Sequence, residues 1–281
     1  MRSDAKLLLL DKNTVERLLV PDDVLGAVRE AFELHSQRQG RIFPVVREAL
    51  DTGGIFGVKS GDVQSQGLLG FKAAGFWPAN RTLGAEPHQA TVMLFDPATG
   101  RPMCVIDGNA ITTARTAAAG ALGLSLLARC DSKVVTVFGT GVQAKAQLKA
   151  ALRALPSLQK VHYVSVDRAP KPDFEAAFHG SREVTSASDA NAAVAASDVV
   201  ITATPGAGPL FDASALRPGT HLNCVGADTR GKRIARRRAC PGPGGRGRPH
   251  AGASVGRTAM VAADPGHRTW RPAHRSRRTP A

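Results

Sequence analysis

The residues best suited to bind a ligand form a glycine pattern near the middle of the chain. Val134 to Phe138 are apolar or β-branched, as in a buried strand, and Gly-x-Gly-x-x-Ala follows at Gly139, Gly141 and Ala144. Strand, tight glycine turn and helix form the context in which this pattern indicates a dinucleotide site. N–H groups at the start of the helix and its positive dipole end would meet the pyrophosphate. An ordinary βα turn in another doubly wound sheet is the alternative.

An acidic residue, Asp167, follows the next predicted strand, Val161 to Val166. An aspartate at this point of a dinucleotide fold hydrogen-bonds the adenosine ribose and repels a 2′-phosphate, so it favours NAD over NADP. Arg168 is the residue type that binds that phosphate, which keeps NADP as a second option. A turn aspartate without a cofactor contact is the structural alternative.

Two cationic residues in the first half of the chain have unusual surroundings. Lys72 lies in the apolar run Gly70 to Ala74, where desolvation would lower its pKa toward a role in proton transfer. A lysine that extends to the surface is an equally good interpretation of that run. Arg115 lies in a predicted helix rich in small residues, Ile111 to Ala128, and its guanidinium can bind a carboxylate in a bidentate pair.

The pattern of apolar residues predicts two sheets of different type, one in each half of the chain. Residues 41–106 contain short β-like runs without crossover helices, which predicts an antiparallel sheet. Together with the preceding helix, Pro21 to His35, this sheet forms a separate domain, and His35 is expected at the edge of its core. After Ala144, strands and helices alternate, which predicts a parallel sheet with ligand loops at strand ends. The small-residue helix is expected to bridge the two.

Charge distribution and cysteine spacing bear on which partners and which cellular compartment the protein is expected to have. The formal net charge is +14, but residues 234–281 hold 11 Arg and a single acid, so the other residues carry 26 basic against 22 acidic groups. The basic excess therefore belongs to the tail, and nucleic-acid or membrane binding is not expected of the main body. Four scattered cysteines predict neither a metal site nor a disulfide framework. The apolar run Leu7 to Leu10 is too short for a signal or membrane segment, so we expect a cytoplasmic protein.

The tail itself, residues 234–281, has 6 Pro, 7 Gly, no Leu and no Phe. This composition predicts disorder. One interpretation is a basic arm that binds nucleic acid through Gly-Gly-Arg-Gly-Arg. The favoured one is a shifted reading frame, because an Arg/Pro/Gly/Ala-rich run without Lys is what a GC-rich gene encodes when displaced by one base.

Several motifs then resemble the ornithine cyclodeaminase/mu-crystallin family, in order, from about residue 5 to 233. They are His88-Gln89-Ala90-Thr91, Asp107-Gly108-Asn109, Ile111-Thr112, Arg115-Thr116-Ala117-Ala118, the glycine pattern, and Val225-Gly226-Ala227-Asp228-Thr229-Arg230-Gly231-Lys232. The resemblance implies an α/β protein with an N-terminal α+β substrate and dimerisation domain (1–128), a Rossmann domain (129–233) and an active site between them.

The resemblance also implies roles for particular residues. Arg47 and Arg115 match the arginines that clamp the substrate carboxylate, Lys72 matches the active-site lysine, and Asp228 matches the aspartate facing the substrate amine or imine. The positions that match dinucleotide contacts are Gly139, Gly141, Val142, Gln143 and Asp167 with its neighbour Arg168.

The implied activity is NAD(P)-dependent chemistry at the Cα–N centre of a small amino acid or a cyclic imine carboxylate. It covers cyclisation of ornithine to proline and reduction of Δ1-pyrroline-2-carboxylate or other ketimines, in a cytoplasmic homodimer. A non-catalytic binding protein is the alternative. After Lys232 the family continues with Glu-Leu and further helices and strands, which Arg233 to Arg238 replace here. The Rossmann domain is thus expected to be incomplete, with an exposed strand edge, and the chain to be a poorly folding, inactive remnant.

Overall fold

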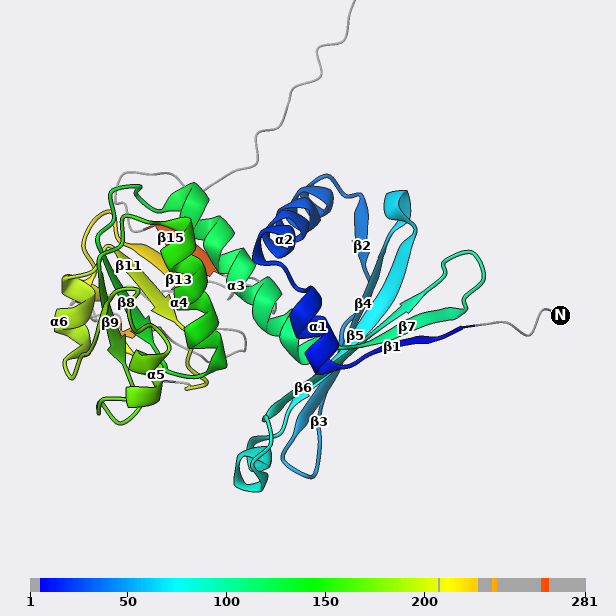
Figure 1. Ribbon diagram of the computed structural model, residues 1–281, viewed down its shortest axis with the longest axis horizontal. Coiled ribbons are helices and arrows are strands. Elements are labelled where there is room, and N and C mark those ends of the chain that lie inside the picture. The colour runs from blue at the N-terminus through cyan, green and yellow to red at the C-terminus, as the bar shows by residue number, and fades with distance from the viewer. Residues whose placement is uncertain (1–5, 207, 227–233, 237–258, 263–281) are drawn as a thin grey trace, which may run out of the picture.

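The computed structural model describes residues 6–206, 208–226, 234–236 and 259–262. It has two sheets, with a long helix, α3 (Gly108–Leu127), running between them (Figure 1). The α/β class expected from the sequence is confirmed.

The first sheet has seven strands in the order β1-β7-β6-β5-β4-β2, with β3 paired to β4. All its pairings are antiparallel except β1 with β7, as the absence of crossover helices predicts. The strands are β1 (Leu8–Leu10), β2 (Gly40–Ile42), β3 (Val46–Ala49), β4 (Ile55–Val63), β5 (Leu68–Phe76), β6 (His88–Phe95) and β7 (Pro102–Asp107). Short 3-10 helices, η1 (Gln64–Gln66) and η2 (Pro78–Leu83), flank β5.

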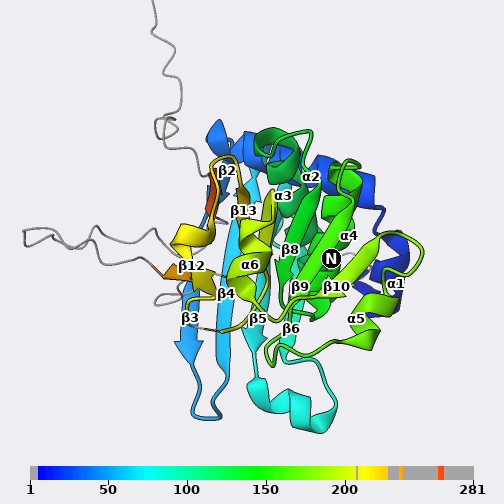
Figure 2. The ribbon, with the colours of Figure 1, turned by 90° about the vertical axis from the view of Figure 1, so that its left-hand side faces the viewer.

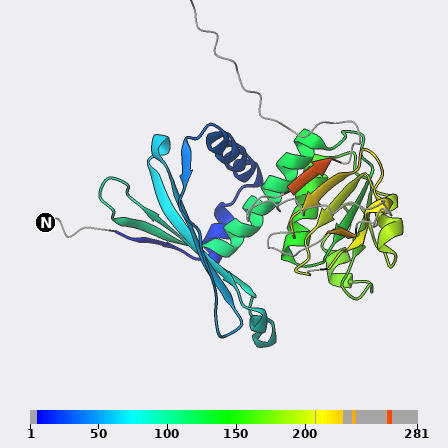
Figure 3. The same ribbon diagram turned by 180° about the vertical axis from the view of Figure 1, so that it is seen from behind.

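The helices α1 (Lys12–Leu18), α2 (Pro21–Ser36) and α3 lie on one face of this sheet, and no helix of the described residues covers the other face in Figures 1 and 3. The prediction that His35 lies at a core edge is wrong, because His35 is exposed and no residue of α2 is buried. Phe32 on the same helix is 49% exposed. The reason is tertiary: α2 contacts α3 and the end strand β2, so only part of its apolar stripe is covered.

Helix α3 contacts both halves of the structure. It packs on β6 of the first sheet, and on α4 (Val142–Ala154) and β13 (His221–Cys224) of the second. Its residues from Ala117 to Leu124 are all buried, and most are Ala or Gly, which lets neighbouring helices approach closely. Among the described helices α3 is long and apolar enough to cross a membrane by composition, but this burial is what a core helix shows.

The second sheet has the order β10-β9-β8-β11-β13-β15. Its strands are β8 (Val134–Phe138), β9 (Lys160–Val164), β10 (Glu183–Ser186), β11 (Val199–Thr202), β13 and β15 (Ala259–Ala262), all parallel except β15. Helices α3, α4 and α5 (Pro172–Ala176) pack on one face, and α6 (Ala190–Ala195) packs on the other (Figure 2). The chain continues from β8 to β9 on one side and returns to β11 on the other, so the end of β8 is the topological switch point.

The C-terminal segment departs from the sequence-based expectation where it is described. Residues 259–262 pair antiparallel with β13, from His221 opposite Ala262 to Cys224 opposite Ala259. β14 (Ala235–Arg236) pairs with β12 (Phe211–Asp212), next to the 3-10 helix η3 (Ala213–Ala215). The expectations of a wholly irregular tail and an uncovered β13 edge are wrong for these pairings, since any extended segment can satisfy the edge hydrogen bonds. The rest of the tail lies outside the described residues.

Candidate functional site

Strand register brings two of the predicted substrate-site residues, Arg47 and Lys72, to one face of the first sheet. Directly opposed residues of antiparallel strands point to the same side. Lys72 opposes Lys59 and Val92, and the next row along the strands is Arg47, Gly57, Ala74 and Ala90. His88, opposite Phe76, belongs to the row after that. The row of Arg47, which otherwise holds only small residues, therefore lies between the row of Lys59 and Lys72 and the row of His88.

Helix α3 lies over this face. The Lys72 ammonium donates a hydrogen bond to Thr112 Oγ1 at 3.3 Å. Gly108 contacts Ala90 so closely that a Cβ on it would lie 2.9 Å from the Ala90 side chain. The helix starts there because the Asp107 carboxylate caps it, accepting from the Asn109 N–H at 3.0 Å. The cap therefore fixes where the helix side chains meet the sheet.

Lys72 is half-buried, and its environment changes its chemistry. Desolvation, and then repulsion from the Arg115 and Lys59 cations, lowers the pKa of Lys72 to about 8. An amine with such a pKa exchanges a proton near neutral pH, which an exposed lysine does poorly. The buried lysine inferred from the run Gly70 to Ala74 therefore agrees with the structure better than one that extends fully to solvent.

Arg115 lies one turn after Thr112 on α3. Solvent reaches its side chain, yet the surrounding protein desolvates it enough to lower its pKa, and the guanidinium stays charged. Neither Arg115 nor Lys72 takes part in any ion pair of the described residues. Arg47, exposed on β3, belongs to the same sheet face. The face therefore presents cations suited to a carboxylate ligand.

His88 was not singled out as a functional residue, although it belongs to a motif quoted above. Its Nδ1 lies 3.1 Å from Asn109 Oδ1, the Asn109 amide donates to Glu86 at 2.8 Å, and Glu86 pairs with Lys12. Burial and the nearby Lys72 and Arg115 charges lower the pKa of His88. Alternate residues of a strand share a face, so counting from Lys72 to Phe76 and then across to the opposed residue of β6 places His88 on this face. The same counting across to β4 places Lys59 there.

The glycine turn has the geometry of a dinucleotide cradle. Gly139 has φ +103, and a Cβ there would lie 2.8 Å from the Ala203 carbonyl oxygen. Nothing lies within 4 Å of the position a Cβ would take on Gly141, which is the N-cap of α4 and makes no side-chain cap. Ala144 is fully buried against the sheet. An open space over uncapped N–H groups fits a pyrophosphate.

The two residues after this turn differ in exposure. Val142 is 64% exposed at the start of α4. Gln143 is partly buried, and its Oε1 atom is enclosed without a hydrogen-bond partner among the described residues. Both lie where the sequence placed cofactor contacts, beside the open space at Gly141.

Asp167 lies three residues beyond the end of β9, not directly at the end of a strand as expected. The chain turns there, with Arg168 at φ +60. The Asp167 carboxylate pairs with Lys171 at 2.5 Å and accepts from Ser165 Oγ at 2.9 Å. These bonds, the one to Lys171 first, hold its pKa well below the usual range. Gly139 N–H donates to the Val164 carbonyl at 3.0 Å, so the glycine turn and the Asp167 turn follow adjacent strand ends.

Asp228, the remaining predicted catalytic residue, lies outside the described residues. Within the described ranges, no group of three or more His, Cys, Asp and Glu side chains could hold a metal ion.

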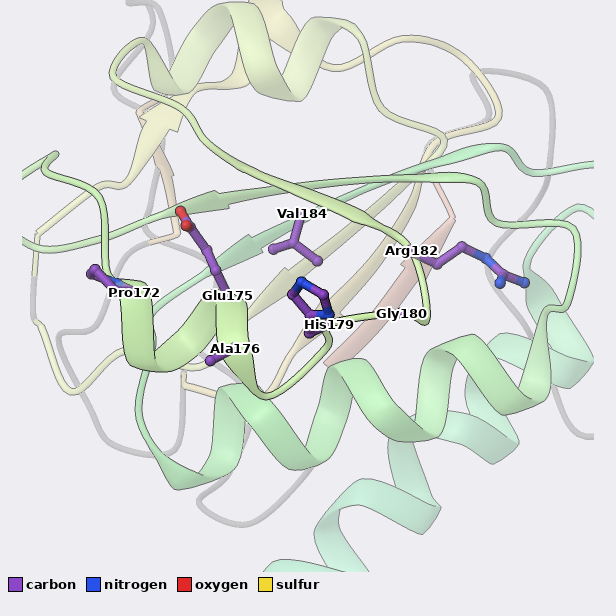
Figure 4. Close-up of a pocket in the computed structure, with 7 residues that line it drawn as sticks. All are labelled: Pro172, Glu175, Ala176, His179, Gly180, Arg182 and Val184. Carbon is purple, nitrogen blue, oxygen red and sulfur yellow. The ribbon is translucent and has the colours of Figure 1, made fainter.

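A separate recess lies between α5 and β10 (Figure 4) and shares no residue with this site. Two of its polar lining residues, Glu175 and Arg182, are held by structural hydrogen bonds. Glu175 accepts from the Tyr163 hydroxyl at 2.5 Å, and Arg182 donates to the Leu158 carbonyl at 2.7 Å. We therefore assign it no role in the chemistry.

The fold and site define a dinucleotide-binding α/β protein, in which one helix joins the parallel sheet to an antiparallel layer bearing a cationic face. The model of the ornithine cyclodeaminase/mu-crystallin family matches residues 5–238. The chain belongs to this family, which confirms the resemblance found in its motifs.

Several relatives have known activities or structures. Iminosuccinate reductase of Paracoccus denitrificans is 32% identical over 231 residues, covering 80% of this chain and 71% of that protein. Its structure in complex with NAD+ has a TM-score of 0.72 at 30% identity, covering 82% of this chain and 71% of the other. An archaeal alanine dehydrogenase dimer with bound NAD has a TM-score of 0.76 at 30% identity, covering 82% and 70%. Δ1-Pyrroline-2-carboxylate reductase of Thermococcus litoralis, with NADH and L-proline, has a TM-score of 0.72 at 28% identity, covering 77% and 68%.

Proposed function

We propose that the protein is an NAD-dependent enzyme that acts at the Cα–N centre of a small amino acid or cyclic imine carboxylate. The observation that carries the proposal is the shared sheet face: Lys72 donates to Thr112 of α3 close to Arg115, and Arg47 lies in the next row of the same face. The relatives named above act on such compounds, and their structures contain NAD+, NAD or NADH.

The proposed roles follow from the chemistry of each group. Arg47 and Arg115 bind the α-carboxylate and so orient the Cα–H bond. Lys72, with a pKa of about 8, gives or takes a proton at the substrate nitrogen. Asp228 is proposed to face that same nitrogen. The nicotinamide ring supplies the hydride acceptor or donor when the cofactor is bound.

The proposed cofactor site comprises the glycine turn with Gly139 and Gly141, the following Val142 and Gln143, and the Asp167 turn. The open space at Gly141 supports it, as does the exposed carboxylate of Asp167, which disfavours a 2′-phosphate. NAD is therefore the proposed cofactor. NADP is the alternative because Arg168 is adjacent to Asp167.

A homodimer is the proposed assembly, built on the sheet face that carries no helix. Leu9, Val46 and Phe56 belong to that face by register and are 69%, 50% and 37% exposed. Large exposed apolar residues spread across one face of a sheet favour a partner that covers them. The related archaeal alanine dehydrogenase is a dimer, so a second copy is the proposed occupant. The proposed location is the cytoplasm, in keeping with the free cysteines 104, 130 and 224.

We further propose a substrate and dimerisation domain over 1–128, a Rossmann domain over 129–233, and a tail over 234–281 that comes from a shifted reading frame. The family match ending at residue 238 supports the last point. Sequencing the coding DNA around codon 233 tests it. An adjacent frame that encodes Glu-Leu and then amphipathic helix and strand patterns is the expected result, and its absence would refute the shift.

Activity is tested by following nicotinamide absorbance with Δ1-pyrroline-2-carboxylate, ornithine and alanine, each with NAD(H) and NADP(H). From protein that folds, we expect turnover of at least one compound with NAD(H) and loss of that turnover in Lys72→Met. Soluble protein that binds NADH but turns over none of these compounds would favour the non-catalytic binding protein. Failure to obtain folded protein would favour the inactive remnant.

A further inference from the structure

A buried amide joins the helix that follows the glycine turn to α3. Gln147 of α4 is 1% exposed, and its side-chain amide donates to the Thr116 carbonyl oxygen of α3 at 2.7 Å. Thr116 directly follows Arg115 in the chain. Gln147 lies on the helix whose N-cap is Gly141. One hydrogen bond therefore links the two proposed halves of the site, the carboxylate-binding arginine and the cofactor turn.

The same stretch of α3 is connected to Lys72. The Thr116 hydroxyl donates to the Thr112 carbonyl oxygen at 2.6 Å. The Thr112 hydroxyl in turn accepts from the Lys72 ammonium at 3.3 Å. A displacement of α3 along its axis would therefore change the surroundings of Lys72 and Arg115 together.

Small residues dominate the part of α3 that packs on α4 and β13. Residues 117–121 are buried, and all of them are Ala or Gly. Such residues let elements approach closely, but they have little shape that selects one register, so hydrogen bonds between the elements carry more of that task. Asn223 of β13 supplies a second such bond, donating to the Gly120 carbonyl oxygen at 3.0 Å.

The Gln147 amide is placed here at a cost that packing alone does not require. Its Oε1 atom is buried without a hydrogen-bond partner among the described residues. The same atom lies so near Gly120 that a Cβ there would be 2.1 Å from it. An unpaired buried acceptor lowers stability, whereas a methionine of similar size would fill the space without one. Buried polar groups of this kind are the ones that can specify a single register.

We propose that Gln147 is a positioning residue that sets the register of α3 on α4 through its bond to Thr116. That register holds Arg115, and the Thr112 partner of Lys72, at a fixed distance from the glycine turn. A misplacement of about 1 Å can slow a reaction about 100-fold, so this spacing matters for hydride transfer between substrate and cofactor. The proposal rests on the proposed function of the site, but the register itself is measurable without substrate.

The test compares the full-length parent protein with three variants. Gln147→Met keeps the length of the side chain and removes the donor, and Gln147→His retains an N–H group. Gln159→Met removes an exposed amide elsewhere in the same half of the chain and is the matched control. The first measurement is urea unfolding, in which Gln147→Met should have the same midpoint as the parent or a higher one, because it removes the unpaired oxygen.

The second measurement follows Lys72 by NMR of lysine labelled at Cε, with the resonance assigned by its loss in Lys72→Met. Burial, and then the neighbouring cations, set the pKa of Lys72 to about 8 in the parent protein. In Gln147→Met this pKa should rise by at least about 0.5, because a displaced α3 desolvates and repels the ammonium less. Gln147→His and Gln159→Met should leave it unchanged.

The third measurement is a fluorescence titration of NADH, alone and with saturating L-proline. If the register sets the spacing of the two sites, each ligand favours the arrangement that the other needs. In the parent protein, L-proline should tighten NADH binding at least about 5-fold. In Gln147→Met this factor should fall below about 2, although NADH alone binds within about 3-fold of the parent affinity.

An unchanged Lys72 pKa in Gln147→Met, or an unchanged effect of L-proline on NADH binding, would overturn the proposal. A Gln147→Met protein that unfolds at lower urea would also overturn it, since Gln147 would then have a structural role alone. A parent protein whose NADH affinity does not respond to L-proline, combined with a raised Lys72 pKa in Gln147→Met, would refute the proposed function and leave the register in place.

Discussion

Replacing Lys72 by Met should make the protein more stable while removing its activity. Methionine keeps the length of the side chain but carries no charge, so it relieves both the desolvation of the ammonium and its repulsion by Arg115 and Lys59. A fall in pKa from 10.5 to about 8 corresponds to about 3 kcal/mol of destabilisation when the ammonium is charged. Lys72 is only half-buried, and solvent screening reduces the expected gain to about 1–2 kcal/mol.

The sign of this effect depends on pH. The folded-state pKa of Lys72 lies below its unfolded value, so the unfolded chain binds more protons between pH 8 and 10.5. The penalty is therefore complete below about pH 8 and disappears as the pH rises through 10.5. The advantage of Lys72→Met should be full at about pH 7 and small at about pH 10.

The assay is urea unfolding of the parent protein and Lys72→Met at both pH values, with Lys149→Met as a matched control. The control substitution lies on the exposed surface of α4 and should change stability by less than about 0.5 kcal/mol. A Lys72→Met protein less stable than the parent at neutral pH, or one with the same gain at both pH values, would refute the account of a desolvated, repelled ammonium.

Three further outcomes are expected. Gly139→Ala places a Cβ at φ +103 within 2.8 Å of a carbonyl oxygen and should lower the free energy of unfolding by about 1–3 kcal/mol. Gly141→Ala should melt like the parent but bind NADH at least about 10-fold more weakly in a fluorescence titration. Equal melting of the two variants would contradict the backbone geometry. Asp167→Ser should reduce the preference for NADH over NADPH, measured as a ratio of dissociation constants, by about 10-fold or more, and an unchanged ratio would mean that the ribose end of the cofactor lies elsewhere. Gly120→Ala should lower the free energy of unfolding in urea by about 1–3 kcal/mol, because the new Cβ would lie 2.1 Å from Gln147 Oε1. Alanine has the better helix propensity, so a more stable variant would show that this contact relaxes freely.

The local patterns that predicted the dinucleotide half of the structure were correct because each depends on short-range chemistry. A buried strand, a turn that requires glycine and a helix start are adjacent in sequence, so Gly139, Gly141 and Ala144 could be assigned without knowing what packs around them. The alternation of strands and helices after Ala144 similarly predicted the parallel sheet. The surroundings of Asp167 were not predicted, because its pairing with Lys171 depends on how the chain turns after β9.

The cationic face of the first sheet depends instead on contacts between residues far apart in the sequence. The sequence by itself determined the family, the fold class, the strand–glycine turn–helix unit and the presence of a lysine in an apolar run. Only the tertiary structure decided that Lys59, thirteen residues before Lys72, lies opposite it and that His88 shares the same face. It also decided that α3 brings the Arg115 charge close to Lys72 and His88. The physical reason is strand register: the two-residue alternation fixes which residues of one strand share a side, but a shift of one position in the pairing moves a whole strand's side chains to the other face.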